Sequence, residues 1–372
     1  MVAGYTHKAM NETSETCIQK CDYNNIDMNS LLSPIGGIDR FVKKGDRVLL
    51  KVNLLSPSDP SKGVTTHPAV VAAVADAVIK AGGKPYIGDS PSGPFTKRAL
   101  EKTYVRSGLK KVAGDMSIEL NYDTGITKVP VPNGNKLKKT SICNYVLSAD
   151  KIIALPKIKT HDFMIMTLAT KIMFGAVPGL TKAKYHSMFP KKESFAEMLL
   201  DVLSVATPDL FVMDGVVGME GNGPQNGKPV KLGVMLASDN ALAMDIAVCK
   251  MLGIEPATIP TLKRAKIRGM WPSDVKYPLL RPDNVEIKGF KLPSTARRKT
   301  KLSPLPTEKC IACSKCEEIC PRGAVKVIKG RAKVNYSLCI RCYCCHEVCP
   351  VNAIRLVSKK ELVKTQHPLF DH

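Results

Sequence analysis

Two cysteine runs near the C-terminus constrain the fold of this chain more than any other feature. The first run reads Cys310-x2-Cys313-x2-Cys316-x3-Cys320-Pro321, and eighteen residues later the second reads Cys339-x2-Cys342-x2-Cys345-x3-Cys349-Pro350. Three closely spaced thiolates followed by x3-Cys-Pro are typical of [4Fe–4S] cluster binding, where the fourth Cys of each run ligates the other cluster. Each run is therefore expected to curl around a cluster.

The spacing predicts two [4Fe–4S] clusters with crossed ligand sets. We assign the first cluster to Cys310, Cys313, Cys316 and Cys349, and the second to Cys339, Cys342, Cys345 and Cys320. Zinc sites are the alternative, but zinc ribbons use paired C-x2-C knuckles rather than a triple run. Residues 306–357 resemble the bacterial dicluster ferredoxin domain, which implies a small α+β domain at this end of the chain.

The remaining five of the thirteen cysteines are expected to be free thiols of a reducing compartment, namely Cys17, Cys21, Cys143, Cys249 and Cys344. A redox pair or metal site formed by Cys17 and Cys21 stays open as an alternative. Cys344 lies among cluster ligands that already fill the cluster, so we interpret it as a bystander. The chain shows neither an apolar run long enough to span a membrane nor the apolar segment of a signal peptide, so we expect a cytoplasmic protein.

The net charge of +22 does not by itself indicate nucleic acid. Lys and Arg are spread along the sequence, and aromatic residues make up only 5%, so platforms for base stacking are scarce. We therefore expect a redox protein partner with acidic character, or a small anionic substrate, rather than nucleic acid.

The region before the cysteine runs alternates between strand and helix patterns. We expect strands at residues 46–55, 85–88, 128–132, 150–156, 210–214, 230–237 and 285–290, and helices at 68–81 (capped by Thr66), 96–107, 167–174, 194–206 and 240–252. Residues 1–29 show only a weak helical pattern. This alternation predicts an α/β fold with a largely parallel open sheet and flanking helices.

Composition suggests four segments. Residues 1–295 would form the α/β domain, 296–305 a basic linker, 306–357 the cluster-binding domain, and 358–372 a polar tail. The sequence contains no G-x-G-x-x-G fingerprint and no P-loop lysine motif, so neither NAD nor ATP is favoured. A flavin or an additional metal has no supporting motif.

Polar side chains follow the predicted strands, and ligands of open parallel sheets bind at the carboxyl ends of strands. As candidate catalytic residues we select His67, Lys157, His161 and Asp214. As candidate binding residues for an anionic ligand we select Lys51, Asn53, Thr66, Asp89, Lys159, Gly221 and Gly223. A metal held by His67, His161 and Asp214 is an alternative that their spacing does not demand.

Several short motifs resemble one known family in their order along the chain. They are LLKVNLLS, GVTTHP, GDSPSG, ALPKIKTH, TKIMFGAVPG, DGVVGMEGNGPQNGKP and DNALAMDIAVCKMLG, which together span about residues 47–255. They are similar to the domain-of-unknown-function 362 family, whose members often carry a dicluster ferredoxin domain. The resemblance implies an iron–sulfur protein of anaerobes and archaea, and it supplies no reaction and no catalytic residues.

Three functional hypotheses follow from these patterns. The first is a ferredoxin-coupled oxidoreductase, in which two [4Fe–4S] clusters pass single electrons to an anionic substrate or cofactor in the α/β domain. The second is a non-catalytic electron carrier or maturation factor that docks a partner protein. The third is a non-redox enzyme such as an isomerase, with structural or sensing clusters.

Overall fold

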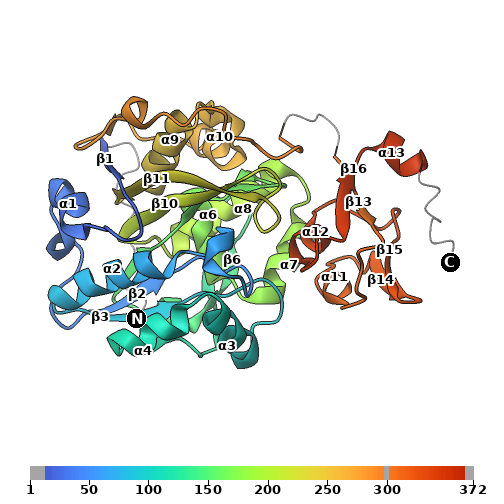
Figure 1. The fold of residues 1–372 in the computed structure, drawn as a ribbon, viewed down its shortest axis with the longest axis horizontal. Helices are drawn as coiled ribbons and strands as arrows, with labels where there is room; N and C mark the ends of the chain where they lie inside the picture. Colours follow the sequence, from blue (N-terminus) through green and yellow to red (C-terminus); the bar gives the residue numbers. More distant parts are fainter. Residues whose placement is uncertain (1–12, 297–300, 365–372) are drawn as a thin grey trace.

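The computed structural model describes residues 13–296 and 301–364. A large α/β unit is followed by a small C-terminal unit that packs against its side through helix α12 (Figure 1). The fold class predicted from the alternating strand and helix patterns is thus confirmed.

The large unit is built on a ten-stranded sheet in the order β12-β1-β11-β10-β7-β2-β3-β4, with β8 and β9 attached beside β10. Its strands are β1 (Ser14–Lys20), β2 (Arg47–Lys51), β3 (Lys84–Gly88), β4 (Glu119–Leu120), β7 (Lys151–Ala154), β8 (Lys157–His161), β9 (Ile165–Met166), β10 (Leu210–Glu220), β11 (Lys228–Ser238) and β12 (Val275–Lys276). The run from β10 through β7, β2 and β3 to β4 is parallel throughout. A separate antiparallel pair is formed by β5 (Ile126–Pro130) and β6 (Lys139–Cys143).

Strand β2 explains why the sheet is covered on both faces. It lies between β7 and β3, so a continuous apolar sequence suits it better than an alternating one. Val48 and Leu50 join the core under α1 (Met28–Leu32), α2 (Pro68–Lys80), α3 (Lys97–Arg106) and α4 (Leu109–Met116). Leu49 joins the opposite core, formed with α6 (Leu168–Ile172), α8 (Lys192–Val205), α9 (Ala241–Met251) and α10 (Pro260–Ile267).

Five further helices occur in the described residues. They are α5 (Asn144–Leu147), α7 (Gly179–Met188), α11 (Lys315–Glu318), α12 (Cys344–Val348) and α13 (Lys359–Lys364). Short 3-10 helices occur at Ser33–Ile35, Ile38–Arg40, Pro60–Lys62, Met173–Ala176, Pro256–Thr258 and Pro282–Val285.

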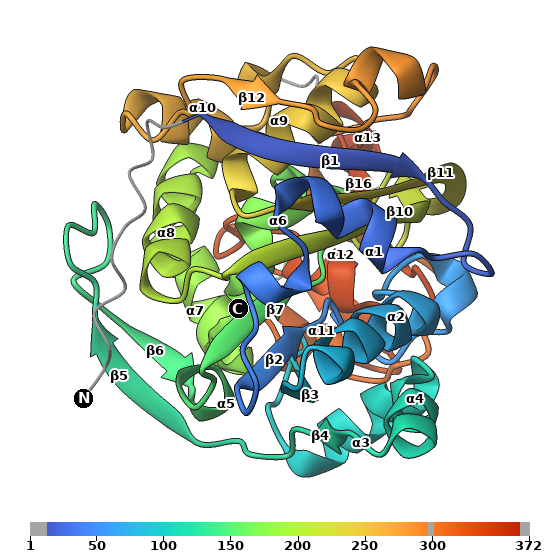
Figure 2. The same cartoon turned by 90° about the vertical axis from the view of Figure 1, so that its left-hand side faces the viewer.

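The N-terminal segment is a strand, which corrects the expected weak helix. β1 pairs antiparallel with β11 and places Cys17 and Ile18 in the two cores (Figure 2). Its SETCIQK sequence is only weakly apolar, so periodicity within seven residues could not reveal a strand that tertiary pairing stabilises.

Three other local predictions were wrong. The strand expected to end at Asp214 continues to Glu220 and turns back as β11, so the two form an antiparallel hairpin rather than successive parallel strands. Residues expected as a strand at 285–290 contain only the end of a 3-10 helix. His67, not Thr66, caps α2, because the His67 Nδ1 atom accepts the Ala69 N–H at 3.2 Å.

The C-terminal unit pairs β13 (Ser303–Pro306) with β16 (Ile354–Val357), and β14 (Val325–Ile328) with β15 (Arg331–Val334). It therefore begins at Ser303, inside the expected linker of residues 296–305, of which 297–300 lie outside the described residues. The expected polar tail begins with α13.

The C-terminal unit also repeats its backbone every 29 residues. Left-handed φ angles recur at Ala312 and Arg341, at Ser314 and Tyr343, and at Gly323 and Asn352. The Ala324 N–H donates to Cys320 Sγ and the Ala353 N–H donates to Cys349 Sγ, each at 3.2 Å. The two cysteine runs are thus two copies of one local structure.

A carboxylate on α9 fixes the start of α6, where Leu168 has a φ of +51°. Buried Asp245 accepts the backbone N–H groups of Ala169 at 2.7 Å and Thr170 at 3.0 Å. This contact supports the short helix that carries Lys171.

We expect Asp245→Asn to lower the free energy of unfolding by about 1–3 kcal/mol, because the amide turns one acceptor into a donor that faces a backbone N–H. Anaerobic urea unfolding measures the effect, with exposed Asp115→Asn as the control. Equal stabilities of the two variants would contradict this role of Asp245.

Candidate functional site

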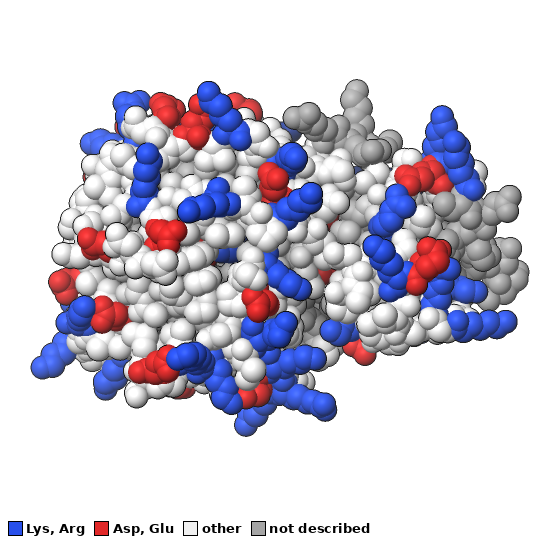
Figure 3. Space-filling view, in the orientation of Figure 1, with Lys and Arg blue, Asp and Glu red and all other residues white. Residues whose placement is uncertain are grey.

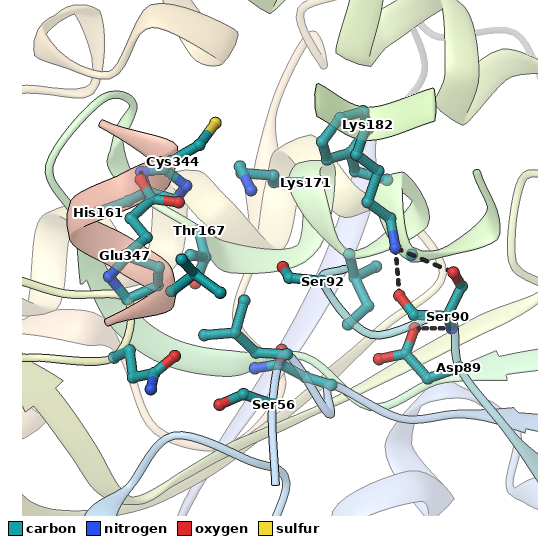
Figure 4. Close-up of a pocket in the computed structure, with 18 of the residues that line it drawn as sticks. Ser56, Asp89, Ser90, Ser92, His161, Thr167, Lys171, Lys182, Cys344 and Glu347 are labelled. Atoms are coloured by element: carbon teal, nitrogen blue, oxygen red, sulfur yellow. Dashed lines mark hydrogen bonds and ion pairs between the residues drawn. The ribbon is translucent and has the colours of Figure 1, made fainter. Parts of the chain in front are cut away.

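A cavity of about 120 Å³ lies between the α/β unit and the C-terminal unit. Its walls come from the loops after β2 and β3, from β8, α6 and α7, and from the C-terminal residues Ile319, Cys344, Glu347 and Val348 (Figure 4). This volume holds several water molecules or a small organic anion.

The cavity brings together six of the residues selected from the sequence: Lys51, Asn53, Asp89, Lys157, Lys159 and His161. Five selected residues do not line it: Thr66, His67, Asp214, Gly221 and Gly223. The carboxyl-end rule predicted neighbours at one edge of the sheet, but not the direction of each side chain.

Lys51 and Asp89 form a buried ion pair at one end of the cavity, with 2.7 Å between Nζ and Oδ1. Asp89 also accepts the backbone N–H groups of Leu54 and Ser90. A Cβ atom on Gly175 would lie 2.3 Å from Asp89 Oδ1 and 2.4 Å from Lys51 Nζ, so only glycine fits against this pair. The pair is thus enclosed by the loops after β2 and β3 on one side and by Gly175 on the other.

A second buried ion pair joins Lys157 Nζ to Asp214 Oδ2 at 2.7 Å, and both side chains are fully buried. Asp214 also accepts the Tyr23 hydroxyl and the His67 N–H, each at 3.0 Å. The ring of His67 stacks on Tyr23 with centroids 3.6 Å apart. Asp214 and His67 therefore lie behind the cavity wall and position Lys157.

The other selected residues hold backbone segments in place. Thr66 Oγ1 donates to the Leu155 carbonyl and accepts the Asn53 N–H. Gly223 packs against Thr160, where a Cβ atom would lie 2.2 Å from the carbonyl oxygen. Gly221 has a φ of +76°, and its N–H donates to the Lys291 carbonyl. The glycine loop thus brings Pro224 and Gln225 to the cavity.

Lys159 donates to the Val64 carbonyl at 2.7 Å and to Asn53 Oδ1 at 3.3 Å. Burial lowers the pKa of this ammonium, and nearby Lys171 and Lys157 lower it further. Lys159 therefore has neutral acceptors in place of a carboxylate partner.

Two further lysines line the cavity from helices, so the rule that ligands bind in loops after strands did not predict them. Lys171 lies on α6, and within the described chain its ammonium forms no hydrogen bond or ion pair; it lies 5.3 Å from the Phe174 ring centroid. Lys182, on α7, donates to Ser90 Oγ at 3.2 Å and to the Pro91 carbonyl at 3.3 Å. Burial lowers the pKa of Lys182 to about 8, although Asp89 opposes the shift.

His161 faces the C-terminal unit across the cavity. Its Nδ1 atom accepts the N–H groups of Phe163 at 3.2 Å and Met164 at 3.4 Å, which leaves the ring proton on Nε2. Burial and the nearby Lys171 lower the pKa of His161, so its ring is neutral. Glu347 Oε1 lies 3.4 Å from His161 Nδ1, and burial raises the pKa of Glu347 to about 8.

Among the described residues, three buried polar atoms that line the cavity lack a hydrogen-bond partner: Ser56 Oγ, His186 Nδ1 and Glu347 Oε1. Buried polar groups in proteins are almost always paired with protein, water or ligand. Together with Lys171, they make the cavity suitable for a polar, negatively charged ligand.

Cys344 also lines the cavity, although the sequence suggested a bystander. The repeat explains this placement, because α12 packs on α7 through Cys342, Cys344 and Ala183. His346, on the same helix, has Nε2 3.1 Å from Asp162 Oδ2, and its carbonyl accepts the Asn226 amide at 3.0 Å. The C-terminal unit is thus joined to the cavity wall by polar contacts.

The cysteines of the first predicted set, Cys310, Cys313, Cys316 and Cys349, line one small cavity. The Ala332 N–H donates to Cys310 Sγ at 3.4 Å and the Ala353 N–H to Cys349 Sγ at 3.2 Å, as cluster thiolates require. Cys320 and Cys342 lie near Cys339 and Cys345, where their negative charges raise the pKa of those thiols alongside burial. The thiols of each predicted set therefore lie close together, and the division into two ligand sets stays a prediction.

No single-ion metal site formed by three His, Cys, Asp or Glu side chains occurs in residues 13–296 and 301–364. His67 and Asp214 lie behind the cavity wall, so they do not form the optional metal site with His161. None of the helices in these ranges is long and apolar enough to cross a membrane.

Comparisons with known proteins agree with this architecture. Residues 305–326 and 332–355 match the 4Fe-4S binding domain, and residues 48–250 match the domain of unknown function DUF362. A thylakoid-associated protein of Synechocystis sp. is 37% identical over 269 residues, which cover 72% of this chain and 82% of that protein.

Two solved structures are more distantly similar. Lactate racemase apoprotein from Thermoanaerobacterium thermosaccharolyticum gives a TM-score of 0.42 at 14% identity, with 65% of this chain and 57% of that chain covered. A protein from Thermotoga maritima gives a TM-score of 0.31 at 10% identity, with 54% and 51% covered. The chain thus spans little more than half of either structure. By the extent of its sequence match, this chain is an iron–sulfur protein that belongs to the DUF362 family.

Proposed function

We propose that this protein is a ferredoxin-coupled oxidoreductase that acts on a small anionic substrate or cofactor in the cavity between its two units. One observation carries the proposal: cavity-lining lysines of the α/β unit face Cys344 and Glu347 of the helix that also carries Cys345. A ligand in this cavity would contact both the anion-binding wall and the cluster-binding helix.

The cysteines fit two [4Fe–4S] clusters, which supply transfer of single electrons when bound. We assign Cys310, Cys313, Cys316 and Cys349 to one, and Cys339, Cys342, Cys345 and Cys320 to the other. All thirteen cysteines are free thiols in the described chain, which suits work in a reducing compartment such as the cytoplasm.

The charge arrangement favours an anion over a neutral ligand. Lys51 and Lys157 are each neutralised by a buried carboxylate. Within residues 13–296 and 301–364, Lys171 has no carboxylate partner at hydrogen-bond distance. Burial lowers its pKa, although Glu347 opposes the shift, so an anionic ligand would stabilise its charged form. A charge-assisted hydrogen bond in a water-poor cavity is stronger than one at the surface, which makes Lys171 the best anchoring cation.

We assign proton transfer to the part of the cavity where His161 faces Glu347. Neutral His161 keeps its Nε2 proton, while its Nδ1 atom is fixed by two backbone N–H groups. A neutral imidazole held in one orientation is suited to donate a hydrogen bond from Nε2 to a ligand that gains electrons. Glu347, whose pKa burial raises to about 8, is protonated at neutral pH and would supply the proton, which leaves its carboxylate behind. Lys157 and Lys159 complete the basic wall, and Asp214 positions Lys157.

The central test measures binding of small anions to the anaerobic holoprotein by calorimetry. Inorganic phosphate, acetate, oxalate and succinate are the probes. We expect at least one to bind in a single site, and Lys171→Met to weaken it by about 10- to 100-fold, because a hydrogen bond to a charged group contributes about 1.5–3 kcal/mol.

The matched control is Lys184→Met, an exposed lysine on α7. Its binding should equal that of the original protein. Equal affinities of the Lys171 and Lys184 variants would overturn the assignment of Lys171. Failure of every probe to bind the original protein would contradict the anion site.

Anion binding should also depend on pH through Lys182. Because its pKa is about 8, the ammonium loses its proton as the pH rises through 8 and the cavity loses positive charge. Affinity should therefore fall between pH 7 and 9. Glu347, whose pKa is also about 8, gains negative charge over the same range. Lys182→Arg should therefore make the fall smaller than in the original protein, since guanidinium stays protonated; an equal fall in the variant would refute the role of Lys182.

Measuring iron and sulfide per chain distinguishes the cysteines that bind a cluster from Cys344. The original protein should contain about eight iron and about eight sulfide atoms per chain when prepared without oxygen. Cys345→Ser should lose about half of both, and neighbouring Cys344→Ser should lose none. Zinc in place of sulfide, or equal losses in both variants, would disprove the ligand assignment.

A further inference from the structure

The 29-residue repeat gives the C-terminal unit two equivalent faces, of which the large unit covers one. In the second repeat, Ile340 and Cys344 pack against Ala183 of α7. At the same positions of the first repeat stand Ile311 and Lys315. The covered face adjoins the cavity. The equivalent face of the first repeat, which carries Ile311 and Lys315, is not covered by the large unit.

The counterpart face is open and apolar at its centre. The side chain of Ile311 is 60% exposed and that of Val351 is 36% exposed. Both line the small cavity of the first cysteine set, next to exposed Cys313. Large apolar side chains exposed beside a ligand cysteine are costly to leave in water and are typical of an interaction surface.

The surroundings of this face are basic. Residues 301–364 contain thirteen Lys and Arg against five Asp and Glu. The carboxylates of Glu308 and Glu317 are bound by Arg331 and Lys326. Lys309 and Lys315 are exposed and form no ion pair within the described residues. Elsewhere, in the view of Figure 3, basic side chains are spread over both units.

We infer that Ile311, Cys313, Lys315 and Val351, with Lys309 beside them, form a docking surface for an acidic protein that carries single electrons. This inference shares with the proposed function only the assignment of clusters to the cysteine sets. The cavity of the first set is assigned to the cluster itself, so a protein surface would cover the apolar side chains that surround it. Free lysines around it complement carboxylates of the partner.

The two faces then have different tasks. Cys344 and Glu347 of the second repeat, with Ile319 of the first, face the ligand cavity, and Ile311 and Lys315 of the first repeat face outward to the partner. Since α7 already covers Ile340 and Cys344, an external carrier cannot reach that side. The surface around Ile311 is thus the side of the C-terminal unit that an external carrier can reach.

An acidic flavodoxin serves as the probe partner. Carbodiimide joins lysines directly to carboxylates in contact, and peptide mapping identifies the linked lysines. With the anaerobic holoprotein we expect cross-links at Lys309 and Lys315. Links confined to lysines of the α/β unit, or no complex with flavodoxin, would overturn the inference.

A charge-reversal pair adds a quantitative readout. Lys309→Glu combined with Lys315→Glu should weaken flavodoxin binding at least tenfold at low ionic strength, and the difference should shrink as salt rises. The control Lys44→Glu with Lys84→Glu has the same net charge, but its exposed lysines lie at the amino ends of β2 and β3. Equal weakening by both pairs would show a non-specific charge effect and refute the site.

Ile311→Ser tests the apolar centre, because it should weaken binding at every salt concentration. Unchanged iron content and unchanged reduction by dithionite confirm that each variant is intact. Lys171→Met should bind flavodoxin normally, so loss of cavity binding and loss of docking are separate results. Normal docking of both the Ile311 and the Lys309/Lys315 variants would reject the surface.

Discussion

The buried ion pair between Lys157 and Asp214 is the interaction on which the cavity depends. Both side chains are fully removed from water, which is costly unless every charge is paired and hydrogen-bonded. Asp214 meets this need by receiving Lys157, the Tyr23 hydroxyl and the His67 N–H. One carboxylate on β10 therefore joins β8, the start of α2 and the segment after β1. Loss of either partner would leave an uncompensated charge in the centre of the sheet.

The need to pair buried charges also determines which lysine is available to a ligand. Lys51 is bound to Asp89, Lys157 to Asp214, and Lys182 to carbonyl and hydroxyl oxygens of the loop after β3. Their charges stabilise the walls, and Lys171 alone among these four points into the cavity without such a partner (Figure 4). In the part of the chain that the structure describes, the Lys171 ammonium and three polar atoms of the cavity have no partner. Such a cavity is preorganised for an anion, because folding has already met the cost of arranging these groups.

The sequence was informative where one local signal decided the structure. Cysteine spacing indicated the cluster-binding unit, and the buried strands β2 and β7 followed from continuous apolar runs. The helix expected at residues 96–107 is observed as α3, and the Thr96 side chain caps it by accepting the Ala99 N–H. β1 and the turn of β10 into β11 were missed because distant pairing determines them. The cavity positions of Lys171 and Cys344 were not predicted either. Lys171 lies inside a helix, and the direction of Cys344 depends on packing between the two units.

The central claim is that a ligand cavity and the second cysteine set adjoin one another. The most direct measurement is a crystal structure of anaerobically prepared protein with anomalous scattering recorded at the iron edge. The account predicts two groups of iron atoms, one of them enclosed by Cys320, Cys339, Cys342 and Cys345 beside the cavity, and anion density at Lys171. Iron bound elsewhere, or a cavity closed by direct packing of α12 on α6, would contradict it.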